Sequence, residues 1–184
     1  MTIIDTLVTD RTQEDVNFLI DLYSKPFNEW TDEEIYIFLH GSAEILYGSD
    51  SQLDATDGVL YVSDGFLRGA YNSHDLNRVG EAVAYLADRY GDITRNTLDV
   101  TARTDWTIED IPTTADMVAY ITDIKTIRNS IGAYSTTPAV PTSMNKLTFK
   151  IANDIEKILV DADRVLTSQV NNWLYAGEVI AGEV

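Results

Sequence analysis

Cysteine is absent from this sequence of 184 residues, and histidine occurs only twice. Without thiolates the chain can form neither a disulfide framework nor a cysteine-ligated zinc site. A Ser–His–Asp site needs a histidine beside a nucleophile, whereas His40 and His74 lie at the end of one expected helix and in the first turn of another. The sequence therefore favours surface or capping roles for both histidines, and we expect a protein that is not an enzyme.

Basic residues are also scarce: thirteen lysines and arginines accompany thirty acidic residues, which gives a net charge of −17. Nucleic-acid phosphates and anionic membranes both require a positive surface, so we expect neither as a partner. The imbalance is greatest up to Phe66, where fourteen acidic residues accompany only Arg11 and Lys25. This acidic first third either faces a basic partner or keeps the protein soluble.

Long apolar runs and phosphate-binding loops are missing as well. No stretch of about 18 apolar residues could span a membrane, and residues 1–5 lack the basic start and apolar run of a signal peptide. Neither GxGxxG nor GxxxxGK[ST] occurs, so we expect no nucleotide cofactor. The sequence predicts one domain, since a chain of this length can bury a core without disulfide or metal cross-links. Because no signal peptide is recognised, we expect the protein to be made in the cytoplasm.

Helical periodicity dominates what is present, and it predicts a mainly α-helical bundle of about four to five helices. Start signals with a Thr or Asn cap and an acidic residue three positions later stand before several of the expected helices. The expected helices cover about 12–24, 31–40, 73–90 and 113–134, and the last begins near residue 148. We expect residues 1–172 to form the helical domain and residues 173–184 an extended or β-hairpin tail.

Turn-forming residues replace this periodicity between about 42 and 65, which predicts an irregular insertion, with a small β element in the 41–68 region. Residues 97–102 alternate weakly and are a further strand candidate. The acidic stretch 50–58 matches an EF-hand poorly, because Gln52, Ala55 and Tyr61 stand where ligands or glycine are required. An irregular calcium site in this loop and solvated turn acids stay open as alternatives.

Two groups of side chains are candidates for contacts with a partner. Tyr47, Tyr61 and Tyr71 border the irregular stretch, where they would stack on a sugar, fill a partner's pocket or pack on their own chain. The second group comprises the heptad-like seam of the last helix and the aromatic tail, which contact either a neighbouring copy or their own chain. Its members are Ile155, Leu159, Leu166, Trp173 and Tyr175.

Carboxylate pairs are the remaining chemical possibility, since a glycosidase needs two carboxylates held roughly 5 to 10 Å apart across a sugar cleft. Thirty acidic residues make such pairs uninformative, and a helical chain offers no obvious cleft. An enzyme that degrades cell-wall glycans is therefore the least favoured interpretation.

One series of segments is distinctive as a whole, and its clearest member is Gly69-Ala-Tyr-Asn-Ser-His-Asp-Leu-Asn-Arg-Val79. The other members are residues 10–16, 81–87, 104–113, 153–159 and 173–184. In this order the series resembles a known family, the small virion-associated tail or structural proteins of phages and prophages of Gram-positive gut bacteria. The resemblance covers nearly the whole chain except about 42–65, where this sequence is longer than the shorter members.

The resemblance implies a structural protein of a phage tail tip, baseplate or fibre attachment, assembled into the virion through contacts with other tail proteins and with copies of itself. It supplies no catalytic residues. A receptor- or carbohydrate-binding module that uses the 41–68 insertion to recognise a host surface glycan is the alternative. Deleting the insertion distinguishes the two roles, because a binding module would leave intact particles that no longer attach to cells.

Overall fold

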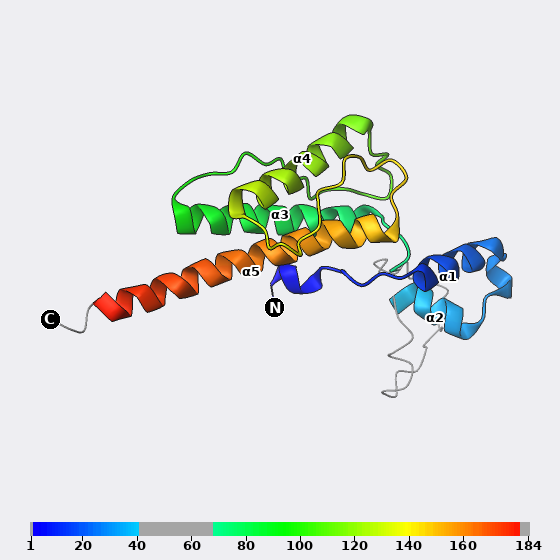
Figure 1. The fold of residues 1–184 in the computed structure, drawn as a ribbon. Coiled ribbons are helices and arrows are strands. Elements are labelled where there is room, and N and C mark those ends of the chain that lie inside the picture. The colour runs from blue at the N-terminus through cyan, green and yellow to red at the C-terminus, as the bar shows by residue number, and fades with distance from the viewer. Residues whose placement is uncertain (1, 41–67, 181–184) are drawn as a thin grey trace.

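The structure, a computed structural model, describes residues 2–40 and 68–180, and within these it contains five α-helices, two short 3-10 helices and no strand (Figure 1). The mainly α class is therefore confirmed, while the small β element expected in the 41–68 region lies outside the described residues. No described helix is both long and apolar enough to cross a membrane. The elements are η1 (Ile3–Thr6), α1 (Gln13–Ser24), η2 (Phe27–Glu29), α2 (Asp32–His40), α3 (Ser73–Thr94), α4 (Thr114–Ile131) and α5 (Phe149–Ile180).

The bundle consists of α3, α4 and α5, with η1 packed on α3 and α5 (Figure 1). Each helix contributes apolar residues at spacings of three and four, which place them on one face. Side chains of this size stabilise the fold by roughly 1.5–3 kcal/mol each when they are fully buried. The core includes Val79, Leu86, Ile124, Ile127, Ile155, Leu159 and Leu166, none of which has exposed surface.

A second, smaller unit lies beyond one end of this bundle and consists of α1, η2 and α2 (Figure 1). Leu19 and Leu22 are its buried centre, with half-buried Phe18, Trp30, Phe38 and Ala70 packed around them. The Trp30 ring lies 5.0 Å from that of Phe27 and 5.1 Å from that of Phe38, measured between centroids. We call residues 13–40 the α1–α2 unit.

Capping explains where the helices begin, as the sequence predicts. Thr12, Asn72 and Thr113 each cap a helix, and in each case the acidic side chain three residues later accepts from the backbone N–H of the cap residue. Thr31 and Glu34 make the same reciprocal pair at α2. These bonds satisfy backbone N–H groups that the first turn of a helix leaves free.

The expected extended tail from Trp173 is wrong over the described residues, because α5 continues to Ile180. Extending an existing helix fixes one residue for each new hydrogen bond, so it costs far less than starting a new one. The single Gly177 weakens the helix by only about 1 kcal/mol, and no proline interrupts the segment. In the same way α3 continues past the expected stop at Gly91 to Thr94, where Arg95 adopts the left-handed conformation, with a φ of 63°.

The strand considered for residues 97–102 does not form, and the segment packs on the bundle core with Ala102 in a left-handed backbone conformation, at a φ of 43°. The backbone N–H groups of Thr101 and Ala102 donate to the buried Asp123 carboxylate at 3.1 and 3.0 Å. Gly80 allows this close approach, since a Cβ there would lie 2.1 Å from the carbonyl oxygen of Arg103. A side chain of α4 therefore takes the place of a partner strand.

Candidate protein-interaction surface

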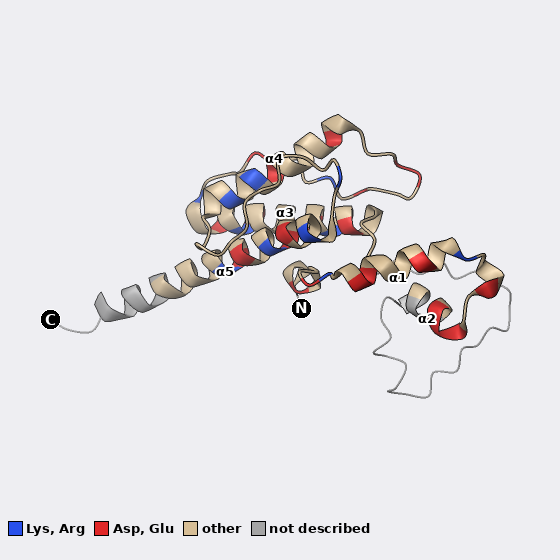
Figure 2. Cartoon of the chain, turned by 45° about the vertical axis from the view of Figure 1, so that its right-hand side comes forward, with Lys and Arg blue, Asp and Glu red and all other residues tan. Residues whose placement is uncertain are grey.

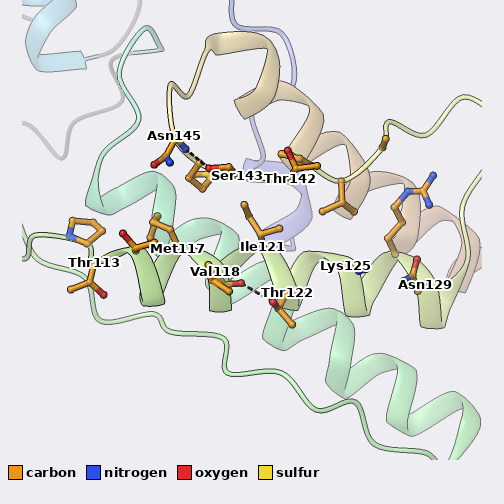
Figure 3. A pocket seen from close by; sticks show the side chains of 17 residues that line it. Thr113, Met117, Val118, Ile121, Thr122, Lys125, Asn129, Thr142, Ser143 and Asn145 are labelled. Atoms are coloured by element: carbon orange, nitrogen blue, oxygen red, sulfur yellow. Dashed lines mark hydrogen bonds between the residues drawn. The ribbon is translucent and has the colours of Figure 1, made fainter.

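An open groove of about 620 Å³ lies between α4 and the segment that leads into α5. Met117 and Ile121 rise from α4 toward the segment that carries Thr142, Ser143 and Asn145 (Figure 3). Its lining is mostly apolar or hydroxyl-bearing. We call it the α4 groove, and it is lined by Pro112, Thr113, Thr114, Met117, Val118, Ile121, Thr122, Lys125, Arg128, Asn129, Ala139, Val140, Pro141, Thr142, Ser143, Met144 and Asn145.

The far wall of the groove is fixed by hydrogen bonds at its base. Arg128 donates from Nε to the carbonyl oxygen of Pro138 at 2.9 Å. The buried Thr137 hydroxyl donates to the Asp161 carboxylate at 2.8 Å and accepts from the Tyr134 N–H at 3.1 Å. The prolines of residues 135–144 predict a linker. The hydrogen bonds just described attach this segment to α4 and α5, so it forms a fixed wall of the groove.

Apolar side chains remain exposed on and beside the α4 groove. Val118 is 60% exposed on α4, and Ile111, next to the lining residue Pro112, is 88% exposed. Ile108 belongs to the same loop and is also exposed. Scattered apolar residues need no explanation on a protein surface, but several beside an apolar groove mark a site for another molecule.

The charge of the α4 groove is opposite to that of the molecule. Its only charged lining residues are Lys125 and Arg128, and no acidic residue lines it, although the chain has a net charge of −17. Figure 2 shows basic residues on α4 and acidic residues on α1 and α2. A segment with apolar and acidic side chains would complement the groove better than a basic one.

Buried charges also gather where the N-terminal segment meets α3 and α5. Glu156 is fully buried and accepts from both guanidinium groups, from Arg11 Nη2 at 2.7 Å and from Arg78 Nη2 at 2.9 Å. Asp75 is paired with the same two arginines. Two positive and two negative charges thus compensate one another inside the fold, and such pairing is what a buried charge needs. We call these four residues the buried ion cluster.

Two tyrosines close this cluster on one side. The hydroxyl groups of Tyr71 and Tyr120 are hydrogen-bonded to each other, and the Arg11 guanidinium lies 5.5 Å from the centroid of the Tyr71 ring. Burial raises the pKa of both hydroxyls, and the negative charge of Glu156 raises them further. For Arg78, burial acts to lower the pKa but the hydrogen bond and charge of Glu156 raise it overall. Both tyrosines therefore stay neutral and Arg78 stays charged across the physiological range, as structural groups would.

The predicted contact residues have different positions in the structure. Ile155, Leu159 and Leu166 are fully buried in the bundle core, so the seam packs on its own chain and has no surface left for a neighbour. Tyr71 is half-buried and engaged with Tyr120 and Arg11. Tyr47 and Tyr61 lie outside the described residues. Trp173 and Tyr175 belong to α5, but their side chains also lie outside the description.

The sequence reasoning missed the α4 groove itself. Met117 and Ile121 belong to the apolar stripe of α4, whose periodicity predicts burial, yet these two are only half-buried and line the groove. Val118 was a usable signal, because it is apolar and lies off the buried stripe of its helix. The other wall could not be found from the sequence, since it depends on bonds from Arg128 and Thr137 that no periodicity predicts.

The described residues contain no group of three or more histidine or acidic side chains arranged to hold a metal ion. His74 is exposed, and its backbone N–H donates to Asn72. Comparisons with protein-family models, with curated proteins and with solved structures give no significant match. The α4 groove is therefore interpreted from its own residues.

Proposed function

We propose that this chain is a non-enzymatic component of a protein assembly, and that it binds its partner through the α4 groove. The observation that carries this proposal is the open apolar groove with exposed Val118 and Ile111 beside it. An apolar groove with a polar rim is a common form of peptide- and helix-binding surface. Its lining combines a concave surface, methyl groups and the cationic side chains Lys125 and Arg128, and these suit recognition of another polypeptide.

The assembly that we propose is a phage tail, in which the chain would be part of a tail tip, baseplate or fibre attachment. Support comes from the resemblance carried by residues 69–79 and by the segments in order around them. Residues 69–79 also stabilise this chain's own fold, since Gly69 lies against α1 and Asn72 caps α3. In addition, Asp75 and Arg78 belong to the buried ion cluster. Most of this signature therefore serves the fold.

Quantitative mass spectrometry of purified particles tests the proposal, using bacteria that carry the phage or prophage encoding the chain. We expect the wild-type chain in particles at a fixed ratio to other tail proteins. A Val118→Asp chain should fold but be absent from particles, because a charge in the α4 groove opposes apolar contact. The matched control is Ser130→Asp, which adds the same carboxylate on α4 at an exposed residue outside the groove.

Two results would contradict the proposal in different ways. Particles that lack the wild-type chain would exclude the virion role. Particles that contain folded Val118→Asp in the wild-type amount would exclude the α4 groove as the contact surface.

A further inference from the structure

We propose that the α4 groove receives the α1–α2 unit of a second copy of this chain, so that copies join head to tail. The inference rests on the assembly role proposed above and gives the groove a specific occupant. It depends on a second surface with matching shape and charge, which the α1–α2 unit carries.

That second surface is an apolar ridge on the α1–α2 unit. Ile20, Tyr23 and Phe27 are 61%, 66% and 57% exposed. Ile20 and Tyr23 are neighbours on the helix because they are three residues apart. Tyr23 and Phe27 both contact the Trp30 ring, with centroids 6.5 and 5.0 Å from it. The three side chains therefore form one continuous ridge, supported from below by Trp30.

Acidic residues surround this ridge. Residues 12–40 contain seven acidic residues and one lysine, Lys25, which is already paired with Glu34. Asp21 and Glu29 are exposed directly beside the ridge residues Ile20 and Phe27. The ridge thus presents large apolar groups within a negative field.

The α4 groove has the complementary composition. Lys125 and Arg128 line it without any acidic residue, so it is a local positive site on an otherwise negative molecule. Opposite charges around an apolar contact guide encounter and fix orientation more than they add affinity.

The ridge of one copy does not lie in the groove of the same copy. The α1–α2 unit lies beyond one end of the bundle, while α4 lies along its outer side (Figure 1), and both Ile20 and Val118 remain exposed. A ridge that occupies the groove must then come from another copy. Contacts between two different surfaces are heterologous, and they produce closed rings or open filaments according to the rotation between copies.

Sedimentation velocity on the full chain over a wide concentration range is the first measurement. We expect the wild type to associate beyond a dimer, and to dissociate as salt is raised because the rim charges are screened. Ile20→Asp on the ridge and Val118→Asp in the groove should each weaken association at least tenfold. Gln13→Asp, about two turns of helix away from Ile20, and Ser130→Asp are the matched controls on α1 and α4, and both should associate as the wild type does.

Mixing the two deficient variants provides the decisive test. Ile20→Asp keeps an intact groove and Val118→Asp keeps an intact ridge, so together they should form a 1:1 dimer that grows no further. A symmetric contact through one shared surface would not be rescued by mixing. Circular dichroism confirms that each variant is folded before it is mixed.

A wild type that stays monomeric at all concentrations overturns the head-to-tail contact, and so does a mixture that forms no dimer. Neither result concerns incorporation into particles. The assembly role fails separately, if purified particles lack the wild-type chain.

Discussion

The bundle and the α1–α2 unit are both made of capped amphipathic helices, yet they use their apolar residues differently. The bundle buries many apolar side chains completely, among them Val79, Leu86 and Leu166. Among the side chains of the α1–α2 unit that the structure describes, Leu19 and Leu22 are buried, whereas Ile20, Tyr23 and Phe27 are exposed. Helices with similar caps and periodicity therefore differ in how many apolar side chains they bury. A region with a small core leaves apolar surface that another molecule can cover.

The joint between these regions is polar. Asn153 on α5 accepts from the Arg11 N–H at 3.0 Å and donates to the Arg11 carbonyl oxygen at 2.8 Å. Glu156 accepts from the Val8 N–H and pairs with the Arg11 side chain. Gly69 lies so close to α1 that a Cβ would be 2.2 Å from the Asp15 carbonyl oxygen. The α1–α2 unit is thus attached by a few directed contacts just before and after it.

The largest effect that we predict comes from removing the charge of Glu156. Glu156→Gln leaves two buried guanidinium groups with Asp75 as their only carboxylate partner in the cluster, and breaking such a buried pair costs about 3–5 kcal/mol. Denaturant unfolding followed by circular dichroism measures the loss. If the buried ion cluster connects both regions, they should lose stability together.

The control for this prediction is Asp163→Asn, which removes a partly exposed pair between Arg89 on α3 and Asp163 on α5. An ion pair of that kind contributes about 0–1 kcal/mol. Equal losses in the two variants would show that the buried ion cluster has no special role in stability.

The second prediction compares the two cores directly. Leu22 and Leu86 are both fully buried, the first in the α1–α2 unit and the second in the bundle. Leu86→Ala should lower the free energy of global unfolding by about 2–5 kcal/mol. Leu22→Ala should instead unfold the α1–α2 unit locally, because the part of its core that the structure describes is small and has little stability to lose.

Hydrogen exchange measured by mass spectrometry separates these outcomes. In Leu22→Ala, amides of residues 13–40 should lose protection while those of α3, α4 and α5 keep it. A uniform loss of protection in both regions would mean that the chain unfolds as one unit and that the comparison above is wrong.

The features that the sequence predicted well depend on residues that are close together in the chain. The caps at Thr12, Thr31 and Thr113 depend on residues three positions apart, so they are visible in the sequence and are confirmed. The Asp75–Arg78 pair was expected for the same reason and is present. The contacts of this pair with Arg11 and Glu156 were not expected, because these two residues lie 64 or more positions away along the sequence.

Errors arose where tertiary contacts or helix propagation outweighed local signals. Residues 97–102 alternate as a strand would, but the Asp123 carboxylate on α4 binds their N–H groups instead. Gly91 and Gly177 look like helix stops, yet α3 and α5 continue through them. The apolar seam from Ala152 to Leu166 fitted a neighbouring copy or its own chain equally well, and only the packed bundle distinguishes the two.

The third prediction concerns the attachment of the α1–α2 unit. Asn153→Ala removes two hydrogen bonds to the Arg11 backbone, and a hydrogen bond contributes about 0.5–1.5 kcal/mol. We expect a loss of about 1–2 kcal/mol in global stability and faster proteolytic cleavage within residues 7–12. Gln169→Ala on the exposed surface of the same helix should change neither measurement. Unchanged cleavage in Asn153→Ala would show that Glu156 alone holds the segment.

The smallest effect that we predict is at the exposed N-terminus of α4, on the bundle side of the comparison. Hydrogen bonds from the Thr113 hydroxyl and the Thr113 N–H lower the pKa of the Asp116 carboxyl below its ordinary value of 3.8. A carboxyl whose pKa is lower in the folded state contributes stability at pH values above its unfolded pKa, and this contribution is lost as the pH falls through the folded pKa. Acid should therefore loosen this cap only below pH 3.8.

NMR titration of the Asp116 side chain measures this pKa directly. Thr113→Ala removes the hydroxyl donor, so the Asp116 pKa should rise toward its ordinary value while the core of the bundle is unaffected. Thr122→Ala is the matched control on α4, because the Thr122 hydroxyl donates to the Val118 carbonyl oxygen. If Thr113→Ala leaves the Asp116 pKa unchanged, the backbone N–H alone stabilises the carboxylate. The Thr113 hydroxyl would then serve α4 only as an acceptor, through the Asp116 N–H.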